Sequence, residues 1–98
     1  VSAFLLNRLP ISISLGALGN AYAHLNQLDK AVSTLKKAAD QADNISLSPT
    51  FLVQAGEILE SQGKKDEALK LYETVKSKYA YSMAAQTIDA YIERASAK

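Results

Sequence analysis

The sequence contains no cysteine among its 98 residues, so it can form neither a disulfide framework nor a thiolate metal site. No apolar run approaches the roughly 18 residues of a membrane-spanning helix, and we expect no direct membrane insertion by this chain. Eleven basic residues against ten acidic ones leave a net charge of +1. Such a balance provides no strong field for steering the chain onto nucleic acid, which we do not expect as a partner.

Two stretches of the chain carry the same pattern of apolar and small residues about 37 positions apart. Gly19 matches Gly56 in this pattern, and Ala31 matches Ala68. Helical periodicity runs through almost the whole chain, and no segment shows convincing strand alternation. The sequence therefore predicts an all-α fold, in which two antiparallel helical hairpins stack on one another and a C-terminal helix caps the second.

The periodicity and the turn residues predict five helices, over about 11–25, 29–42, 49–62, 65–79 and 82–96. Ser48 and Pro49 are expected to cap and begin the third helix, and Gly63 to end it. We expect the first helix to bury a stripe made of Leu15, Leu18, Tyr22 and Leu25. The resulting divisions are an apolar lead-in segment over 1–10, a first hairpin with its link over 11–47, a second hairpin over 48–81 and a capping helix over 82–98.

These hairpins resemble tetratricopeptide repeats over residues 12–82. Gly19 and Gly56 match the small position at which the two helices of such a repeat approach most closely, and Leu35 and Tyr72 match the bulky position of the second helix. The resemblance implies a fragment of a right-handed α-α superhelix, or solenoid. It also implies that the first helix of each hairpin lines a concave face, where a peptide or a partner protein binds.

Residues 48–70 and 88–95 also resemble the C-terminal part of membrane-anchored, translocon-ancillary repeat proteins of Bacteroidetes-type bacteria. That resemblance implies a place in the bacterial cell envelope and an anchor in an upstream segment. The segment 1–10 has neither an initiator methionine nor a charged leader, so we expect the chain to be part of a longer protein.

The candidate groove residues are polar side chains at the positions that the resemblance assigns to the concave face: Asn20, His24, Thr50, Gln54, Glu57, Glu60 and Ser61. Their amide, hydroxyl and carboxylate groups can hydrogen-bond a peptide backbone. The lysines of a clamp for a terminal carboxylate are missing, with Gly16 at one of their positions, so we expect no such clamp. His24, Glu57 and Glu60 could converge to ligate zinc or shuttle a proton, although a solvated helix face is the stronger interpretation.

No nucleophile–base pair, metal-ligand spacing or cofactor loop is present, so no catalytic residue and no cofactor is predicted. Four tyrosines near the C-terminus are expected chiefly in the core, with peptide-gripping rings as the alternative: Tyr72, Tyr79, Tyr81 and Tyr91. The candidate self-association residues are apolar side chains at the N-terminal end: Phe4, Leu5, Leu9 and Ile13. Two hypotheses remain, namely a noncatalytic scaffold that binds a protein or peptide on its concave face, and a structural or oligomerisation module with no ligand in the groove.

Overall fold

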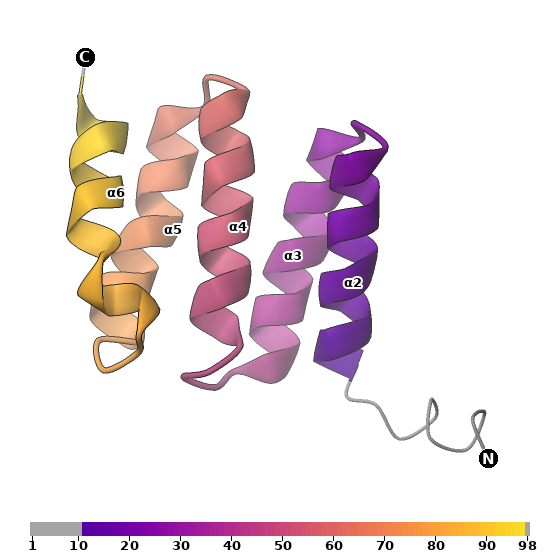
Figure 1. Cartoon of the computed structure of the whole chain (residues 1–98), viewed down its shortest axis with the longest axis horizontal. Helices are drawn as coiled ribbons and strands as arrows, with labels where there is room; N and C mark the ends of the chain where they lie inside the picture. Colours follow the sequence, from indigo (N-terminus) through magenta and orange to yellow (C-terminus); the bar gives the residue numbers. More distant parts are fainter. Residues whose placement is uncertain (1–10, 98) are drawn as a thin grey trace.

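The structure is a computed structural model that describes residues 11–97 of the chain. This part contains five α-helices and one short 3₁₀ helix, η1, and no strand: α2 (Ile11–His24), α3 (Leu28–Ala42), α4 (Ser48–Ser61), α5 (Lys65–Lys78), η1 (Ala84–Gln86) and α6 (Ile88–Ser96). Successive helices alternate in direction, and each packs on the next (Figure 1). The predicted all-α fold of two stacked hairpins followed by a helix is confirmed. Phe4, Leu5 and Leu9 lie outside the described residues.

The two hairpins turn in the same way. Asn26 and Gly63, 37 residues apart, both have a positive φ, of 59° and 77°. The following amides close the helix ends, since Gln27 N donates to Tyr22 O and Lys64 N donates to Leu59 O, each at 2.8 Å. Glycine reaches this left-handed conformation freely, and asparagine is one of the few other residues that tolerates it. The repeat thus extends from the side-chain pattern to the backbone of the turns.

Glycine allows close approach of the two helices within each hairpin. A Cβ atom added at Gly19 would lie 2.8 Å from Cγ of Leu35, and one added at Gly56 would overlap the ring of Tyr72. Leu35 and Tyr72 are both fully buried. The bulky side chain of the second helix therefore occupies the space that the glycine of the first helix leaves open, as the repeat pattern predicted.

The link between the hairpins differs from the prediction. Ser48 does not cap α4 but is its first residue, and its hydroxyl donates to Ala39 O at 2.7 Å and accepts from Asn44 N at 3.1 Å. The side chain of Asn44 organises the turn instead, because its Oδ1 accepts from the backbone amides of Ser46 and Leu47 at 3.0 and 2.8 Å. Buried Ser48 thus joins α3 to α4.

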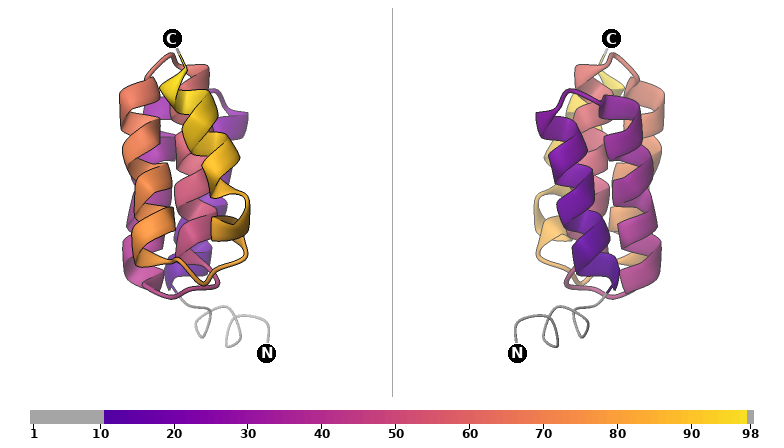
Figure 2. Two further views of the ribbon diagram at one scale, coloured as in Figure 1. Left: turned by 90° about the vertical axis from the view of Figure 1, so that its left-hand side faces the viewer. Right: turned by 90° about the vertical axis from the view of Figure 1, so that its right-hand side faces the viewer.

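The C-terminal segment also differs from the single helix predicted over 82–96. It begins with η1, whose start is held by a hydrogen bond from Ala85 N to Ser82 Oγ of 3.1 Å. Thr87 leaves helical geometry at φ −113°, and α6 follows. Ile88 and Ala95 of α6 are buried, and the helix covers the end of the second hairpin (Figure 2).

The stripe predicted for the first helix is only partly buried. Leu15 and Tyr22 are half-buried, whereas Leu18 and Leu25 are 44% and 67% exposed. Instead α2 buries its small residues, Ser12 and the two glycines at 16 and 19. The prediction for Leu18 and Leu25 was wrong because no described helix packs on that side of α2.

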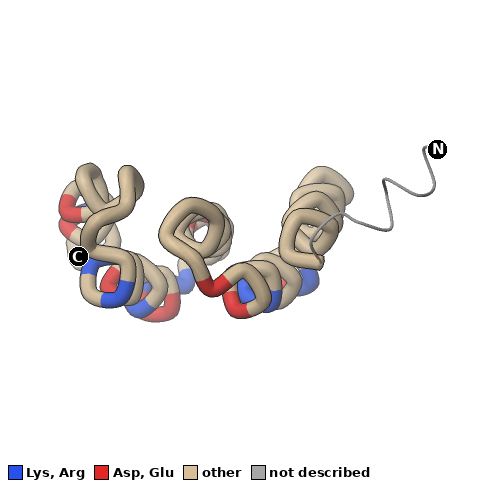
Figure 3. The backbone as a smooth tube through the Cα atoms, turned by 90° about the horizontal axis from the view of Figure 1, so that it is seen from below, with Lys and Arg blue, Asp and Glu red and all other residues tan. Residues whose placement is uncertain are grey.

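The helices form two rows when the molecule is seen along them (Figure 3). The outer row, α3 and α5, carries most of the charged residues of the two hairpins. The inner row, α2, α4 and α6, is curved, and its hollow side faces away from the outer row (Figure 3). Within it, α2 contains no lysine, arginine, aspartate or glutamate, and α4 contains only Glu57 and Glu60. The surface formed by the inner row, which we call the inner face, therefore carries fewer charged residues than the surface formed by the outer row.

Candidate functional site

A cleft of about 270 Å³ opens between α4, η1 and α6, all on the same side of the second hairpin. Thr50, Gln54 and Glu57 line it from α4, where their spacing of four and then three residues places them on one helix face. The other faces of α4 are committed to the core, through Phe51 and Leu59 among others. Tyr91, from α6, lines the opposite side.

Gln54 supplies the most distinctive chemistry in this cleft. Its Oε1 atom is buried and has no hydrogen-bond partner in the described part of the chain. A buried carbonyl without a donor is energetically costly, so such groups are almost always paired. The carboxylate of Glu57 lies exposed on the same helix face, one turn further on. The cleft thus presents the Glu57 carboxylate to a ligand that brings N–H or O–H donors, and the Gln54 carbonyl can accept from such a ligand once its side chain turns toward the cleft.

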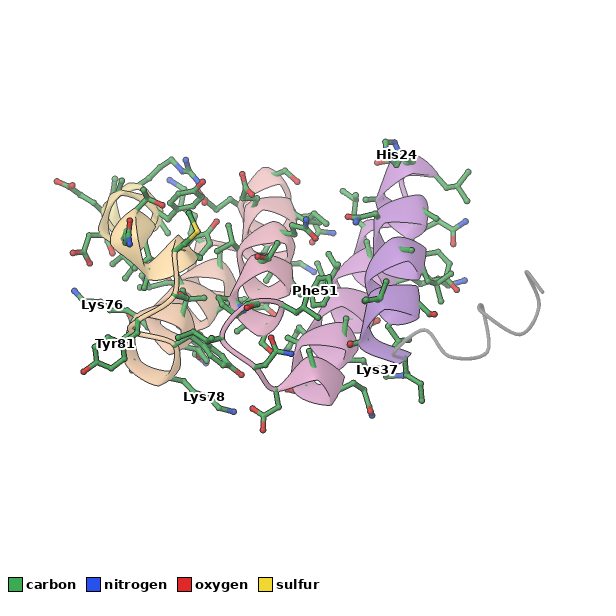
Figure 4. All side chains as sticks on the ribbon, turned by 60° about the horizontal axis from the view of Figure 1, so that its bottom comes forward. His24, Lys37, Phe51, Lys76, Lys78 and Tyr81 are labelled. Atoms are coloured by element: carbon green, nitrogen blue, oxygen red, sulfur yellow. The ribbon has the colours of Figure 1, made fainter. Side chains whose placement is uncertain are left out.

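A second cleft, of about 310 Å³, continues from the first, because both are lined by Thr50 and Ala84. Its walls include Ile45, Tyr81 and Met83, which are 46%, 94% and 84% exposed. Figure 4 shows Tyr81 at the edge of the molecule with its ring away from the core. The expectation that Tyr81 is a core residue was wrong. Together the two clefts combine a polar middle with apolar side chains at one end.

Glu60, one of the candidate groove residues, is paired with two side chains of the described chain. Its carboxylate accepts from Arg94 Nη2 at 2.6 Å, from Arg94 Nε at 2.9 Å and from Tyr72 Oη at 2.5 Å. The Arg94 guanidinium lies 4.9 Å from the centre of the Tyr91 ring, which meets Tyr72 edge to face at 5.4 Å. This network, which we call the α6 latch, fastens α6 to α4 and α5.

The α6 latch also sets the proton affinities of its members. The hydrogen bonds from Arg94 hold the pKa of Glu60 below its usual range, although burial opposes the shift. Burial, followed by the hydrogen bond to Glu60, raises the pKa of Tyr72. Glu60 therefore remains ionised and paired, which leaves Glu57 as the carboxylate that a ligand in the cleft can reach.

The remaining candidate residues lie apart from the cleft. Asn20 and His24 are exposed on α2, and His24 stands at the end of that helix (Figure 4). Ser61 is exposed, and its hydroxyl donates to Ile58 O of its own helix at 2.6 Å. His24, Glu57 and Glu60 form no metal site, since residues 11–97 hold no group of three or more such side chains able to bind a metal ion. Ile13 is 42% exposed on α2.

The sequence reasoning missed Thr87, which lines the cleft from the start of α6. A usable signal was present, because Thr87 follows Thr50 by 37 residues and Tyr91 follows Gln54 by the same interval. The offset between the two hairpins thus continues into the C-terminal helix. Applied there, it would have identified Thr87 and Tyr91 as positions on the inner row.

The fold defines a helical-repeat scaffold, in which stacked hairpins each contact only their neighbours. Two family models of the tetratricopeptide repeat match the chain, one over residues 13–44 and the other over residues 51–82. Together they cover more than half of the sequence, and the chain belongs to the tetratricopeptide-repeat family. Searches of curated proteins and of solved structures returned no significant match.

Tetratricopeptide repeats generally mediate protein–protein interaction, and proteins built from them are generally noncatalytic scaffolds. None of the helices in the described part of the chain is long and apolar enough to cross a membrane. Protein is therefore the class of partner that is typical of this family.

Proposed function

We propose that this chain is a noncatalytic interaction module that holds a peptide segment of a partner protein in the cleft between α4, η1 and α6. The observation that carries the proposal is the buried, unpaired Oε1 atom of Gln54 in the wall of that cleft. A rotation of the Gln54 side chain toward the cleft would let a peptide N–H satisfy this acceptor, and Glu57 beside it favours a donor-rich or cationic segment. Asn20 and His24 extend the polar part of the inner face along α2.

The neighbouring cleft supplies apolar contacts for the same peptide. Tyr81 and Met83 are large side chains left almost fully exposed, and a peptide held at Gln54 can continue over Thr50 to reach them. Aromatic and methionine side chains are over-represented where proteins bind one another. The proposed ligand is therefore a peptide with hydrogen-bond donors at its centre and apolar residues at one end.

The test is selection of binding peptides from a displayed random library, followed by affinity measurement on variants. Gln54→Leu removes the acceptor, and we expect it to weaken a selected peptide about tenfold, the value of one well-placed hydrogen bond. Folding stability should stay the same or rise, because the variant no longer buries an unpaired carbonyl. Glu57→Gln should weaken cationic peptides specifically.

Matched control variants lie on the outer row, where Gln41 and Glu73 are exposed on α3 and α5. Gln41→Leu and Glu73→Gln should leave the affinity unchanged. If peptides bind Gln54→Leu and Glu57→Gln as tightly as the parent chain, or if the library yields no binder, the cleft is not the binding surface.

The setting in a bacterial envelope protein is a separate proposal, which rests only on the resemblance of residues 48–70 and 88–95. Localisation of the tagged full-length protein in cell fractions would test it. Recovery in the cytosolic fraction would refute it without affecting the argument for the cleft.

A second candidate function is that of an oligomerisation module. It is favoured by one observation, which is that α2 exposes large apolar side chains, among them Ile11 and Leu18.

A further inference from the structure

Helix α2 presents an apolar stripe on the side turned away from the rest of the described chain. Ile11 and Leu18 of α2 and Leu25, in the turn directly after it, are 65%, 44% and 67% exposed, and they follow one another at intervals of seven residues. Ser14 and Ala21, also exposed, fall between them. Spacings of three and four residues are those of the a and d positions along the seam of a two-stranded coiled coil. We call these five residues the α2 stripe.

The corresponding face of α4 shows what such a surface receives. Ile11 and Leu18 match Ser48 and Ala55, 37 residues later, and both of the latter are fully buried. In α4 this face packs against α3, an antiparallel neighbour (Figure 1). The α2 stripe is therefore the same kind of helix-binding face, with larger apolar side chains and no described helix upon it.

A helix that covers the α2 stripe has to be of about the length of α3, which covers the matching face of α4 and has 15 residues. Helix α2 of a second copy, with 14 residues, meets this requirement.

A second copy could cover the α2 stripe with its α6, in a head-to-tail contact, or with its own α2. The charged residues on these helices favour the contact between two α2 helices. A head-to-tail contact would set the α2 stripe against α6, where Glu93 is exposed and Asp89 pairs with Lys76 at 2.8 Å. Burying carboxylates against an uncharged surface is strongly unfavourable. A contact between two α2 helices buries no Lys, Arg, Asp or Glu from either helix, because α2 contains none. An isologous contact also closes on itself, whereas a head-to-tail contact propagates.

We propose that two copies of this chain pair through their α2 stripes as an antiparallel dimer with its two-fold axis beside Leu18. Leu18 of one protomer then meets Leu18 of its partner, and Ile11 meets Leu25 at either end. Ser14 and Ala21 give small positions between the large ones, which lets the two helices interdigitate. The cleft on α4 and α6 stays open in this dimer, so the proposal is independent of the peptide-binding function.

The first test measures the mass in solution by light scattering at about 100 µM chain, a concentration that populates a dimer of micromolar affinity. The parent chain should show the mass of two chains. Leu18→Glu, which places like charges at the axis, should show the mass of one chain with unchanged helicity. The matched control Asn20→Glu adds the same charge to a different face of α2 and should remain dimeric. A monomeric parent chain, or a dimeric Leu18→Glu, overturns the proposal.

The second test locates the axis, and it is clean because the chain has no cysteine. Leu18→Cys should form a disulfide-linked dimer on mild oxidation, since a residue on the axis faces its own copy within the roughly 7 Å that a disulfide spans. Ile11→Cys and Asn20→Cys should not. A cross-link through Ile11→Cys as well would indicate parallel helices and overturn the antiparallel arrangement.

The double variant Phe4→Ser/Leu5→Ser distinguishes the α2 stripe from exchange of the N-terminal segment. Under this proposal it stays dimeric. If it becomes monomeric while Leu18→Glu does not, self-association belongs to residues 1–10, and the α2 stripe is not the interface.

Discussion

The two hairpins have the same internal construction but different surroundings. Each places a glycine of its first helix against a buried bulky residue of its second, and each turns through a residue of positive φ. Helix α4, however, lies between α3 and α5, whereas α2 packs on α3 and touches α4 through Phe51, whose ring lies against Gly16, and no described helix covers its other side. At matching positions, Ala55 is fully buried and Leu18 is 44% exposed.

This difference shows that burial in a repeat array belongs to the interface between repeats as much as to the repeat itself. The pattern of apolar residues is nearly the same in both hairpins, yet it predicts the core correctly only where a neighbour is present. In a solenoid each unit contacts only the units beside it, so the face of α2 that has no described neighbour stays exposed.

Exchanging side-chain size at the matching positions 18 and 55 should sharpen the comparison most. Ala55→Leu inserts three carbon atoms into the closed interface between α3 and α4 and should destabilise the fold by about 2–3 kcal/mol. Leu18→Ala removes an exposed side chain and should change stability by about 0.5 kcal/mol or less. Urea denaturation at low micromolar concentration, where self-association contributes least, measures both. Equal effects would show that the two faces are equally covered.

Adding one methyl group at the two glycines tests whether the hairpins are equally tight inside. Gly56→Ala should cost about 2 kcal/mol, because the Tyr72 ring it meets is held by the hydrogen bond to Glu60. Gly19→Ala should cost about 1 kcal/mol, since Leu35 can shift to relieve a contact of 2.8 Å. Thermal unfolding gives the order, and a larger effect at Gly19 would contradict this account of Tyr72.

The α6 latch exists only in the second hairpin, since the position that matches Glu60 in the first is Ala23. Arg94→Gln removes the guanidinium that docks α6, and we expect a loss of about 1 kcal/mol, kept small because Arg94 is half-exposed. Amide hydrogen exchange should show the loss in α6 and in the end of α4. Exchange in α2 and α3 should not change.

Acid should have the same local effect. The pKa of Glu60 is lower in the folded chain than its ordinary value of 4.5, so the contribution of the α6 latch is fully present above that pH. It is lost as the pH falls further, through the folded-state pKa. In Arg94→Gln the protection of α6 should depend less on pH between 5 and 2. A parent chain whose α6 is equally protected at pH 5 and at pH 2 would contradict the assignment.

The fold could be predicted from the sequence because the residue patterns that indicate it are local. Gly19, Gly56 and the apolar spacing around them identify a hairpin without knowledge of its neighbours, and the prediction of the all-α repeat fold was confirmed. The helix boundaries were predicted less accurately where a single polar side chain determines them. Ser82 begins a 3₁₀ turn by accepting from Ala85 N, and nothing in the helical periodicity of residues 82–96 distinguishes that turn from a continuous helix.

The candidate site was only partly predictable for a related reason. Thr50, Gln54 and Glu57 share one helix face, which spacing alone reveals, and the structure brings them together in the cleft. The pairing of Glu60 with Arg94 joins residues 34 positions apart, on two different helices. Such a pairing depends on where α6 docks, and periodicity gives no register for that. The burial of the Gln54 carbonyl likewise requires the wall that α6 supplies.

The smallest effect is expected from the ionic contact between the two turns. Asp29 accepts from Gln62 Nε2 at 3.0 Å and from Lys64 Nζ at 3.4 Å, and the hydrogen bond from Gln62, followed by the charge of Lys64, lowers the pKa of Asp29. Asp29 is fully exposed, so water screens the contact. Asp29→Asn should therefore leave the urea midpoint unchanged within error at neutral pH. A measurable loss would mean that charge helps to hold the first hairpin on the second, whereas an unchanged midpoint would assign that role to the apolar core, in which Phe51, Leu52 and Ala55 cluster with Leu35 and Ala38.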